Sequence, residues 1–210
     1  MSHSKLLDLK YQMLQYASHH DHPVNVGIHL TCIPLIVWSA LVWGANTGPL
    51  IASPSAAAVA SGATIPVALS KLFKFAVPNL SMIMMTGYVT YFTVLDRPTG
   101  LLSVPIFLGA AKHATHFLAT NPKANKIAAY VHILSWLAQF VGHGVFEKRA
   151  PKLTESVVQA AVLGPYFVLW ELLFFLGYRP QLKKELDVLV KADIAAFRAR
   201  KALENKRKHQ

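Results

Sequence analysis

Cysteine and acidic residues are scarce in this chain of 210 residues, and formal charge of either sign is missing from long stretches. The single cysteine, Cys32, cannot form an intramolecular disulfide, which excludes a disulfide-stapled scaffold. Charged residues make up 15% of the chain and hydrophobic residues 53%, whereas an average soluble protein has about 25% charged residues. This balance excludes a disordered polar protein and is unusual for a soluble domain.

Five largely apolar stretches, in which Lys112 and Glu171 are the only formal charges, predict helices that cross a membrane, which needs about 20 apolar residues for each span. We therefore expect an all-α fold, a polytopic membrane helical bundle of about four to five spans. The predicted spans are Ile28–Trp43, Phe75–Leu95, Leu101–Leu118, Ile127–Phe146 and Ser156–Leu176.

The segments around these spans have their own signatures. Apolar residues at helical spacing in residues 4–19 predict an amphipathic helix at the membrane surface. Turns are expected at residues 19–25 and 96–100, where Pro23 and Pro98 disfavour regular helix. Residues 46–74 form an insert rich in Ala, Ser and Pro, for which we expect a variable loop or re-entrant piece, with a span as the alternative.

Positive charge is concentrated at the C-terminal end of the chain. The net charge is +11, and residues 178–210 hold ten of the 21 basic residues. No zinc-finger spacing or RNA-recognition motif accompanies this charge, so we expect no nucleic-acid partner. We expect a membrane domain over residues 1–177 and a basic cytosolic tail over 178–210, which forms a surface helix at residues 181–206 and contacts the lipid bilayer.

Ten histidines are present, and several of them lie in or beside the predicted spans. A buried ionisable group in a membrane is costly and marks a functional site, and neutral imidazole is a common metal ligand. His20 and His29 flank the start of the first span, and His143 ends the fourth, so all three can lie at the same membrane depth. Glu147 follows His143 by one helical turn and is a further candidate ligand or catalytic acid.

His132 is harder to combine with His143. The two residues are eleven positions apart, so a continuous helix would separate them by about 16 Å along its axis. One ion could not bridge them unless the helix breaks near Gly142.

Three other polar residues lie in or beside the apolar segments. Asn25 either caps the first helix or orients a ligand, and Gln139 has the same two alternatives. Glu171 in the fifth span is either a hydrogen-bonded packing residue or a catalytic acid. Any of the histidines could likewise be a structural residue with its hydrogen bonds satisfied.

Three motifs resemble the signature of a membrane family found in fungi, plants and bacteria, whose fungal members are 2-hydroxy fatty acid dioxygenases of the endoplasmic reticulum. The longest runs from His132 to Pro151 and contains W-x-x-Q-F-x-G-H-x-x-F-E. The others are His20-x-x-Pro23-x-Asn25-x-x-x-His29 and Leu163-Gly-Pro-Tyr-Phe-x-x-x-Glu171. The similarity extends from Leu6 to about Leu186.

The resemblance implies a multi-pass enzyme that uses Fe(II) and molecular oxygen to shorten a long-chain 2-hydroxy fatty acid by one carbon, as in phytosphingosine breakdown. It implies metal ligands at His20, His29 and His143, with His132 taken over from the motif. The positive charges of Lys148 and Arg149, directly after the motif glutamate, are candidates to pair with the substrate carboxylate.

Two other functions are compatible with the residues alone. One is a non-enzymatic membrane protein that binds metal or lipid and whose histidines are structural. The other is a diiron lipid hydroxylase or desaturase, but those enzymes use more clustered histidine boxes than the isolated His113-x-x-His116 pair of this chain.

Overall fold

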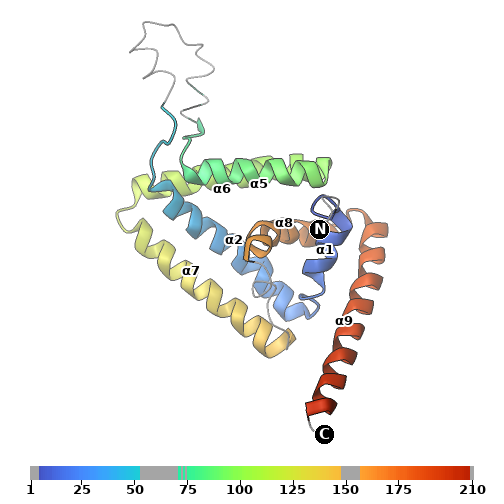
Figure 1. The fold of residues 1–210 in the computed structure, drawn as a ribbon. Coiled ribbons are helices and arrows are strands. Elements are labelled where there is room, and N and C mark those ends of the chain that lie inside the picture. Colours follow the sequence, from blue (N-terminus) through green and yellow to red (C-terminus); the bar gives the residue numbers. More distant parts are fainter. Residues whose placement is uncertain (1–4, 53–70, 72, 74, 148–156, 209–210) are drawn as a thin grey trace, which may run out of the picture. The chain divides into compact units, whose positions relative to one another are not determined.

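A computed structural model describes residues 5–52, 71, 73, 75–147 and 157–208 (Figure 1). Every regular element within these ranges is a helix, which confirms the all-α fold class. The elements discussed below are α1 (Leu9–Ala17), α2 (Pro23–Ala45), α5 (Leu80–Leu95), α6 (Arg97–Thr120), α7 (Ala124–Val141), the π-helix η1 (Gly142–Glu147), α8 (Val157–Phe175) and α9 (Pro180–Lys208).

The chain divides into two compact units. The first unit contains Met1–Leu30 and Gln139–Gln210, and the second contains Thr31–Ala138. Helices α1, α8 and α9 belong to the first unit together with the opening turns of α2 and the π-helix. Helices α5, α6 and most of α7 belong to the second.

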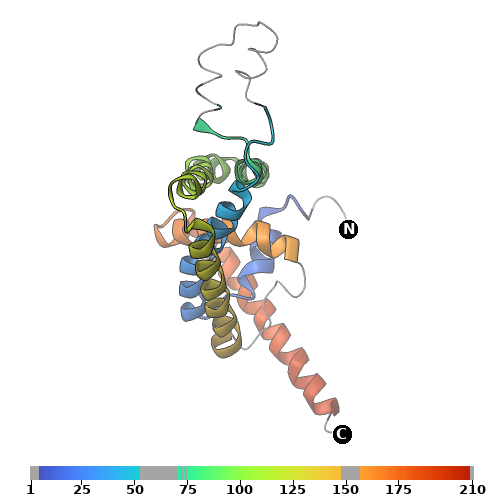
Figure 2. The same ribbon diagram turned by 90° about the vertical axis from the view of Figure 1, so that its left-hand side faces the viewer.

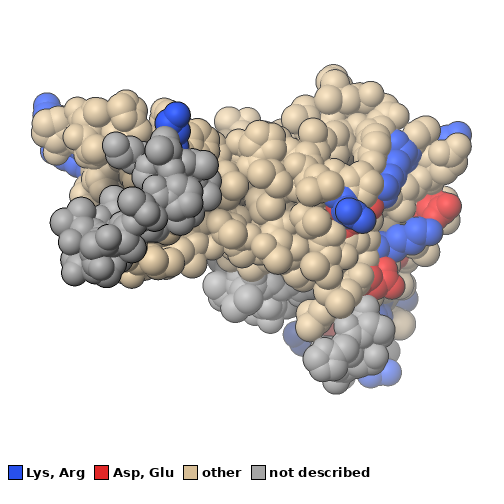
Figure 3. Space-filling view, turned by 90° about the horizontal axis from the view of Figure 1, so that it is seen from above, with Lys and Arg blue, Asp and Glu red and all other residues tan. Residues whose placement is uncertain are grey.

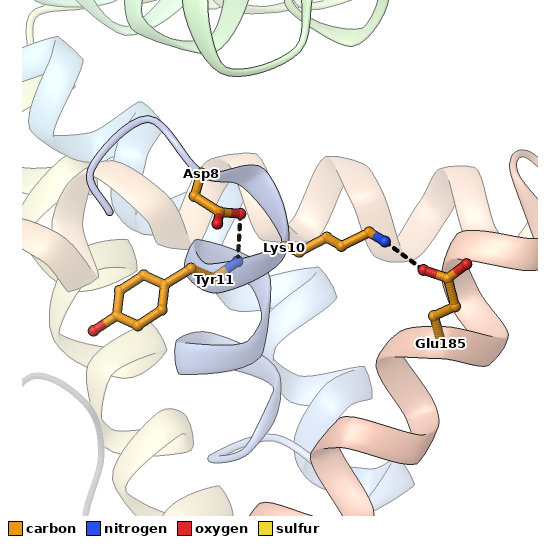
Figure 4. A network of polar contacts seen from close by, with 4 residues as sticks. All are labelled: Asp8, Lys10, Tyr11 and Glu185. Carbon is orange, nitrogen blue, oxygen red and sulfur yellow. Dashed lines mark hydrogen bonds and ion pairs between the residues drawn. The ribbon is translucent and has the colours of Figure 1, made fainter. Parts of the chain in front are cut away.

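In the first unit, α1 packs against both α8 and α9. Asp8 caps α1 by accepting a hydrogen bond from the backbone N–H of Tyr11, and Lys10 pairs with Glu185 on α9 (Figure 4). The predicted amphipathic helix over residues 4–19 is therefore shorter than expected, because the Asp8 cap sets its start. The predicted C-terminal surface helix is present as α9.

In the second unit, α5 and α6 lie side by side, as Figures 1 and 2 both show. Asp96 alone separates them, and its carboxylate accepts a hydrogen bond from the N–H of Thr99 at the start of α6. The predicted turn at residues 96–100 is wrong in extent, because Pro98 occupies a first-turn position, where proline is tolerated in a helix. A β-carbon at Gly100 would lie 2.3 Å from the backbone of Thr93, so only glycine allows this tight reversal.

Helix α2 begins earlier than the sequence predicted. Pro23 is its first residue, so residues 23–25 are helical rather than part of a turn. Proline suits this position because its missing N–H has no intrahelical partner at a helix start. As a result, Asn25 and His29 lie on the same helix, one turn apart.

The predicted fourth span changes its helical type before it ends. Residues Ala124–Val141 are α-helical, but Gly142–Glu147 form a π-helix. A π-helix carries one more residue per turn than an α-helix and is frequent at functional sites. The side chains that follow Val141 therefore leave the helical register on which the sequence-based geometry relied.

Among the described residues, α2 is the one helix that by itself has the length and composition to cross a membrane. The bent pair of residues 160–175 and 180–208 raises the number of candidate spans to two if it counts as one span. In the view of Figure 3, the acidic side chains lie together with several basic ones, other basic side chains lie apart from them, and wide stretches of the surface carry no formal charge. These features support membrane association. The segments 53–70 and 148–156, which include most of the predicted insert, lie outside the described residues.

Candidate metal and substrate site

His20, His29 and His143 form a compact group in the first unit. One ring nitrogen of each lies within 4.8 Å of the others, and all three residues are buried. The ring centroids are 4.3 Å apart for His20 and His29, 5.0 Å for His20 and His143, and 4.9 Å for His29 and His143. Three segments supply them: the turn after α1, the first turns of α2, and η1.

Two of the three rings are held by the same local hydrogen bond. His20 Nδ1 lies 2.8 Å from the carbonyl oxygen of Tyr16, and His29 Nδ1 lies 2.9 Å from that of Asn25. A carbonyl oxygen only accepts, so each Nδ1 must carry the proton and donate. The Nε2 atom of both rings is then left with a free lone pair, which is the arrangement that orients histidines for a metal.

His143 completes the group. Its Nδ1 is buried and has no hydrogen-bond partner among the described residues. A buried nitrogen without a partner is costly, so its presence beside two oriented imidazoles fits a site built for a cation. Burial, and next the neighbouring His29 ring, hold the pKa of His20 well below its ordinary value. The His20 ring is therefore neutral near pH 7, the form that binds metals.

Tyr16 packs against the histidine group, and the sequence analysis did not predict this role. Its ring stacks on His20 with centroids 4.0 Å apart and lies at a tilt against Phe167 of α8 with centroids 4.1 Å apart. Burial, and then the nearby Glu171 carboxylate, raise the pKa of Tyr16, so the phenol stays protonated. The sequence signal was available, because Tyr16 lies one turn before His20 and its carbonyl holds that ring.

Glu147 lies in a different position from the one its spacing suggested. Its Oε1 accepts hydrogen bonds from the backbone N–H of His22, at 2.9 Å, and from Asn25 Nδ2, at 3.0 Å. The carboxylate thereby ties the end of η1 to the start of α2. Glu147 is not in the group of potential ligands, and its Oε1 is engaged by these two donors instead.

A contact between Gly142 and Asn25 sets the approach of the π-helix to α2. A β-carbon at Gly142 would lie 2.3 Å from Asn25 Oδ1 and 3.3 Å from Ile28 Cδ1. Only glycine permits this distance, and the same approach brings the following residue, His143, to His29. The backbone carbonyl of Asn25 holds His29, and its side-chain amide donates to Glu147, so a role of that amide in orienting a ligand stays a prediction.

His132 is held by hydrogen bonds within the second unit. Its Nε2 accepts from the indole N–H of Trp136 at 2.9 Å, and its Nδ1 lies 2.9 Å from Ser39 Oγ. The Ser39 hydroxyl donates to the carbonyl of Ile36, so it accepts from His132 Nδ1. Both ring nitrogens are engaged, and the structure does not bring His132 into the histidine group.

The remaining predicted site residues fall into three places. Glu171 lines a small, mainly apolar cavity together with His20 and His29. Gln139 is buried in the first unit, and its Nε2 has no hydrogen-bond partner among the described residues. Lys148 and Arg149 lie outside the described residues.

The donor set suits a first-row transition metal. Three imidazoles without a thiolate can hold zinc, iron or copper, and three protein ligands leave positions open for small molecules. The apolar residues around the cavity, such as Val26, Leu30 and Phe167, limit the access of water. The fold and site thus define an all-helical protein with a buried three-histidine group.

Comparison with known proteins places the chain in a family. Residues 6–176 match the family of Mpo1-like 2-hydroxy-palmitic acid dioxygenases, and the chain belongs to this family. It is 30% identical over 182 residues to the 2-hydroxy-palmitic acid dioxygenase MPO1 of Saccharomyces cerevisiae, which covers 87% of this chain and 89% of the yeast protein. No solved structure matches it significantly. The resemblance inferred from the three motifs is confirmed, and membership of this family supports an oxidoreductase activity.

Proposed function

We propose that this protein is an Fe(II)-dependent dioxygenase that performs the α-oxidation of long-chain 2-hydroxy fatty acids to acids one carbon shorter. The observation that carries the proposal is the buried group of His20, His29 and His143, two of whose rings are fixed with a free Nε2. Family membership and the name of the yeast relative support the substrate class.

The three histidines would hold the metal. Bound Fe(II) supplies the electrons that allow O₂ to react with a closed-shell substrate and offers open coordination positions to both. The backbone carbonyls of Tyr16 and Asn25 keep two of the ligands in one tautomer, so no reorientation of those rings is needed when the metal enters.

The cavity beside the histidines would receive the polar head of the substrate. His20, His29 and Glu171 all line this cavity, so the 2-hydroxyl group would donate to the Glu171 carboxylate, which would then hold the proton. Lys148 and Arg149 are proposed to pair with the substrate carboxylate, and Gln139 to orient the site. The apolar side chains of the cavity exclude water, which would compete for the site.

The overall reaction needs no reductant other than the substrate. Oxidation of the hydroxyl-bearing carbon to a carboxyl group and of the original carboxyl carbon to CO₂ releases four electrons, the number that reduces one O₂ to the level of water. A 2-hydroxy acid and O₂ therefore give the shortened acid, CO₂ and water.

We further propose that the protein is a multi-pass protein of the endoplasmic reticulum membrane that acts in phytosphingosine breakdown. Support comes from the apolar α2, the basic α9 and the resemblance of the motifs. A membrane location suits the substrate, because long-chain acids partition into the bilayer.

The test is turnover by the purified full-length protein in detergent. Protein loaded with Fe(II) receives 2-hydroxypalmitate under isotopically labelled O₂, and the products are analysed by mass spectrometry. We expect a shortened acid that carries the label in its carboxyl group. His143→Ala should lose both turnover and bound iron, whereas His116→Ala, at an exposed histidine of α6, should keep both. A wild-type protein that binds iron but forms no shortened acid would refute the proposed reaction.

A further inference from the structure

The corner between α8 and α9 (residues 172–184) exposes apolar side chains. Phe175 is 87% exposed and Leu176 is 70% exposed, the two highest values among the exposed large hydrophobic residues that the structure describes. Leu172, one turn earlier on α8, is 50% exposed. Residues at i, i+3 and i+4 share one face of a helix, so these three side chains form a single apolar tip where α8 ends. An exposed apolar patch of this kind marks a contact with a membrane or with a partner protein.

Cations and aromatic rings lie at the base of this tip. The guanidinium of Arg179 lies 5.6 Å from the ring centroid of Trp170 and 5.2 Å from that of Tyr178. Lys184 follows on the first turns of α9 and is exposed. The whole of α9 carries nine basic and four acidic residues. Aromatic rings beside Lys and Arg are typical of the membrane interface, where the cations reach the headgroup phosphates, so this combination favours a lipid surface over a partner protein.

Helix α8 is long enough to cross a bilayer. Its 19 residues measure about 28 Å, close to the hydrocarbon thickness of about 30 Å. If α8 crossed, its middle would lie at the bilayer centre. That middle packs against α1, because Phe167 lies against Tyr16 with ring centroids 4.1 Å apart, and Leu163 and Met13 line the same small space. A crossing α8 would therefore place α1 at the bilayer centre as well.

An exposed ion pair excludes that depth for α1. Lys10, one turn before Met13, pairs with Glu185 of α9, and both side chains are 55% exposed (Figure 4). Exposed charges at the centre of a bilayer are costly, because hydrocarbon cannot solvate them. The middle of α8 thus belongs at the level of the headgroups or of water, and only the apolar tip is free of such neighbours.

We infer that the apolar tip enters one leaflet of a phospholipid bilayer and that α8 and α9 leave the bilayer on the same side. The chain direction changes by 119° between residues 160–175 and 180–208, and Gly177, with φ +83°, permits the turn. The segment predicted as the fifth span is then a re-entrant tip. This inference rests on the proposed membrane location, and it does not depend on the proposed reaction.

The tip would also fix the depth of the histidine site. Glu171, one turn before Phe175, lines the cavity that contains His20 and His29. Insertion of the tip therefore holds this cavity near the headgroups. The carboxyl end of an acid dissolved in the bilayer lies at the same level, so the substrate would reach the site without leaving the membrane.

The first experiment determines on which side of the membrane the two ends of α8 lie. Full-length protein with Cys32→Ser receives one new cysteine, at Ala161 or at Lys184, both of which are exposed. Sealed microsomes from expressing cells are treated with a membrane-impermeant maleimide before and after detergent. We expect the two cysteines to behave alike, because both ends lie on one side. If one reacts in intact microsomes and the other only after detergent, α8 crosses the membrane and the inference is overturned.

The second experiment measures the depth of the tip. An environment-sensitive fluorophore is attached at Phe175→Cys, Leu176→Cys or Lys184→Cys in nanodiscs of phosphatidylcholine and phosphatidylserine. We expect nitroxides on the acyl chains to quench the first two labels most, and nitroxides on the headgroups to quench the third. Leu203→Cys is the matched control, because Leu203 is a 60% exposed leucine at the far end of α9. Equal acyl-chain quenching at Phe175 and Leu203 would overturn the assignment to the tip.

Carbonate extraction separates this inference from the proposed location. If alkaline carbonate leaves the protein in the membrane but the label at Phe175 is not quenched by lipid nitroxides, the inference is wrong and the membrane location stands. A blue-shifted label without such quenching would show that protein, not lipid, covers the tip. If carbonate releases the protein, the multi-pass location fails together with the inference. None of these measurements uses turnover, so the proposed reaction is tested independently.

Discussion

The α-carbon of Gly142 packs against the side-chain amide of Asn25, so closely that a β-carbon there would lie 2.3 Å from Asn25 Oδ1. This contact joins the π-helix to the first turn of α2. Each of its two residues is linked to one histidine of the group. His143 follows Gly142 directly, and the carbonyl of Asn25 holds His29. The distance between these two histidines therefore depends on the absence of a single methyl group.

We expect Gly142→Ala to separate η1 from α2 and to weaken metal binding. The added β-carbon overlaps a buried amide that is held by Glu147 and cannot move freely, which costs about 1–3 kcal/mol of stability. Metal content by mass spectrometry and the thermal unfolding of the helical circular dichroism signal would measure both effects. Gly144→Ala is the control, because a β-carbon at Gly144 meets no atom within 4 Å. Equal metal content in the two variants would contradict this role of Gly142.

The helices were largely predictable, because each has a long apolar or amphipathic pattern bounded by polar residues. The errors in the prediction lie at the helix ends, where a single capping residue determines the boundary. Asp8 shortens α1, Asp96 reduces a five-residue turn to one residue, and Pro23 starts α2 rather than preceding it. Such caps depend on one side chain and give little periodic signal.

The histidine group was predicted by depth, since the residue that enters one span and the residue that leaves another meet at the same level. The sequence could not predict the change from α-helix to π-helix, which depends on the tertiary contact between Gly142 and Asn25. The expected pairing of His143 and Glu147 does not occur, because Glu147 Oε1 accepts hydrogen bonds from His22 and Asn25. The separation of His132 from His143 along one helix had already counted against a shared ion, and both ring nitrogens of His132 take part in hydrogen bonds.

His132→Ala should lower stability but leave the metal in place. Its ring accepts from the Trp136 indole and donates to Ser39, so truncation removes both hydrogen bonds. Each lost hydrogen bond costs about 0.5–1.5 kcal/mol. We expect a lower unfolding temperature together with wild-type iron content per folded protein. A loss of iron equal to that of His143→Ala would instead show that His132 is a ligand.

Substitutions of Glu147 can likewise distinguish a structural role from a chemical one. Glu147→Gln keeps an oxygen that can accept from the N–H of His22 and from Asn25, whereas Glu147→Ala removes both hydrogen bonds. We expect the glutamine variant to retain most of the bound metal and turnover, and the alanine variant to lose stability by about 1–3 kcal/mol. If Glu147→Gln abolishes turnover at full metal content, the carboxylate takes part in proton transfer and the clamp is only part of its role.

Tyr16 holds His20 in two ways, and substitutions can separate them. The backbone carbonyl bond to His20 Nδ1 remains in any substitution, but the stacked ring is lost in Tyr16→Ala and kept in Tyr16→Phe. Loss of a buried aromatic side chain costs about 3–5 kcal/mol, so we expect Tyr16→Ala to unfold at lower temperature and to bind metal weakly. Tyr16→Phe should match wild type in metal content. Its turnover then reports on the phenol alone: unchanged kcat means that Tyr16 only supports the ring, whereas a lower kcat with unchanged metal content means that its protonated hydroxyl acts beside Glu171.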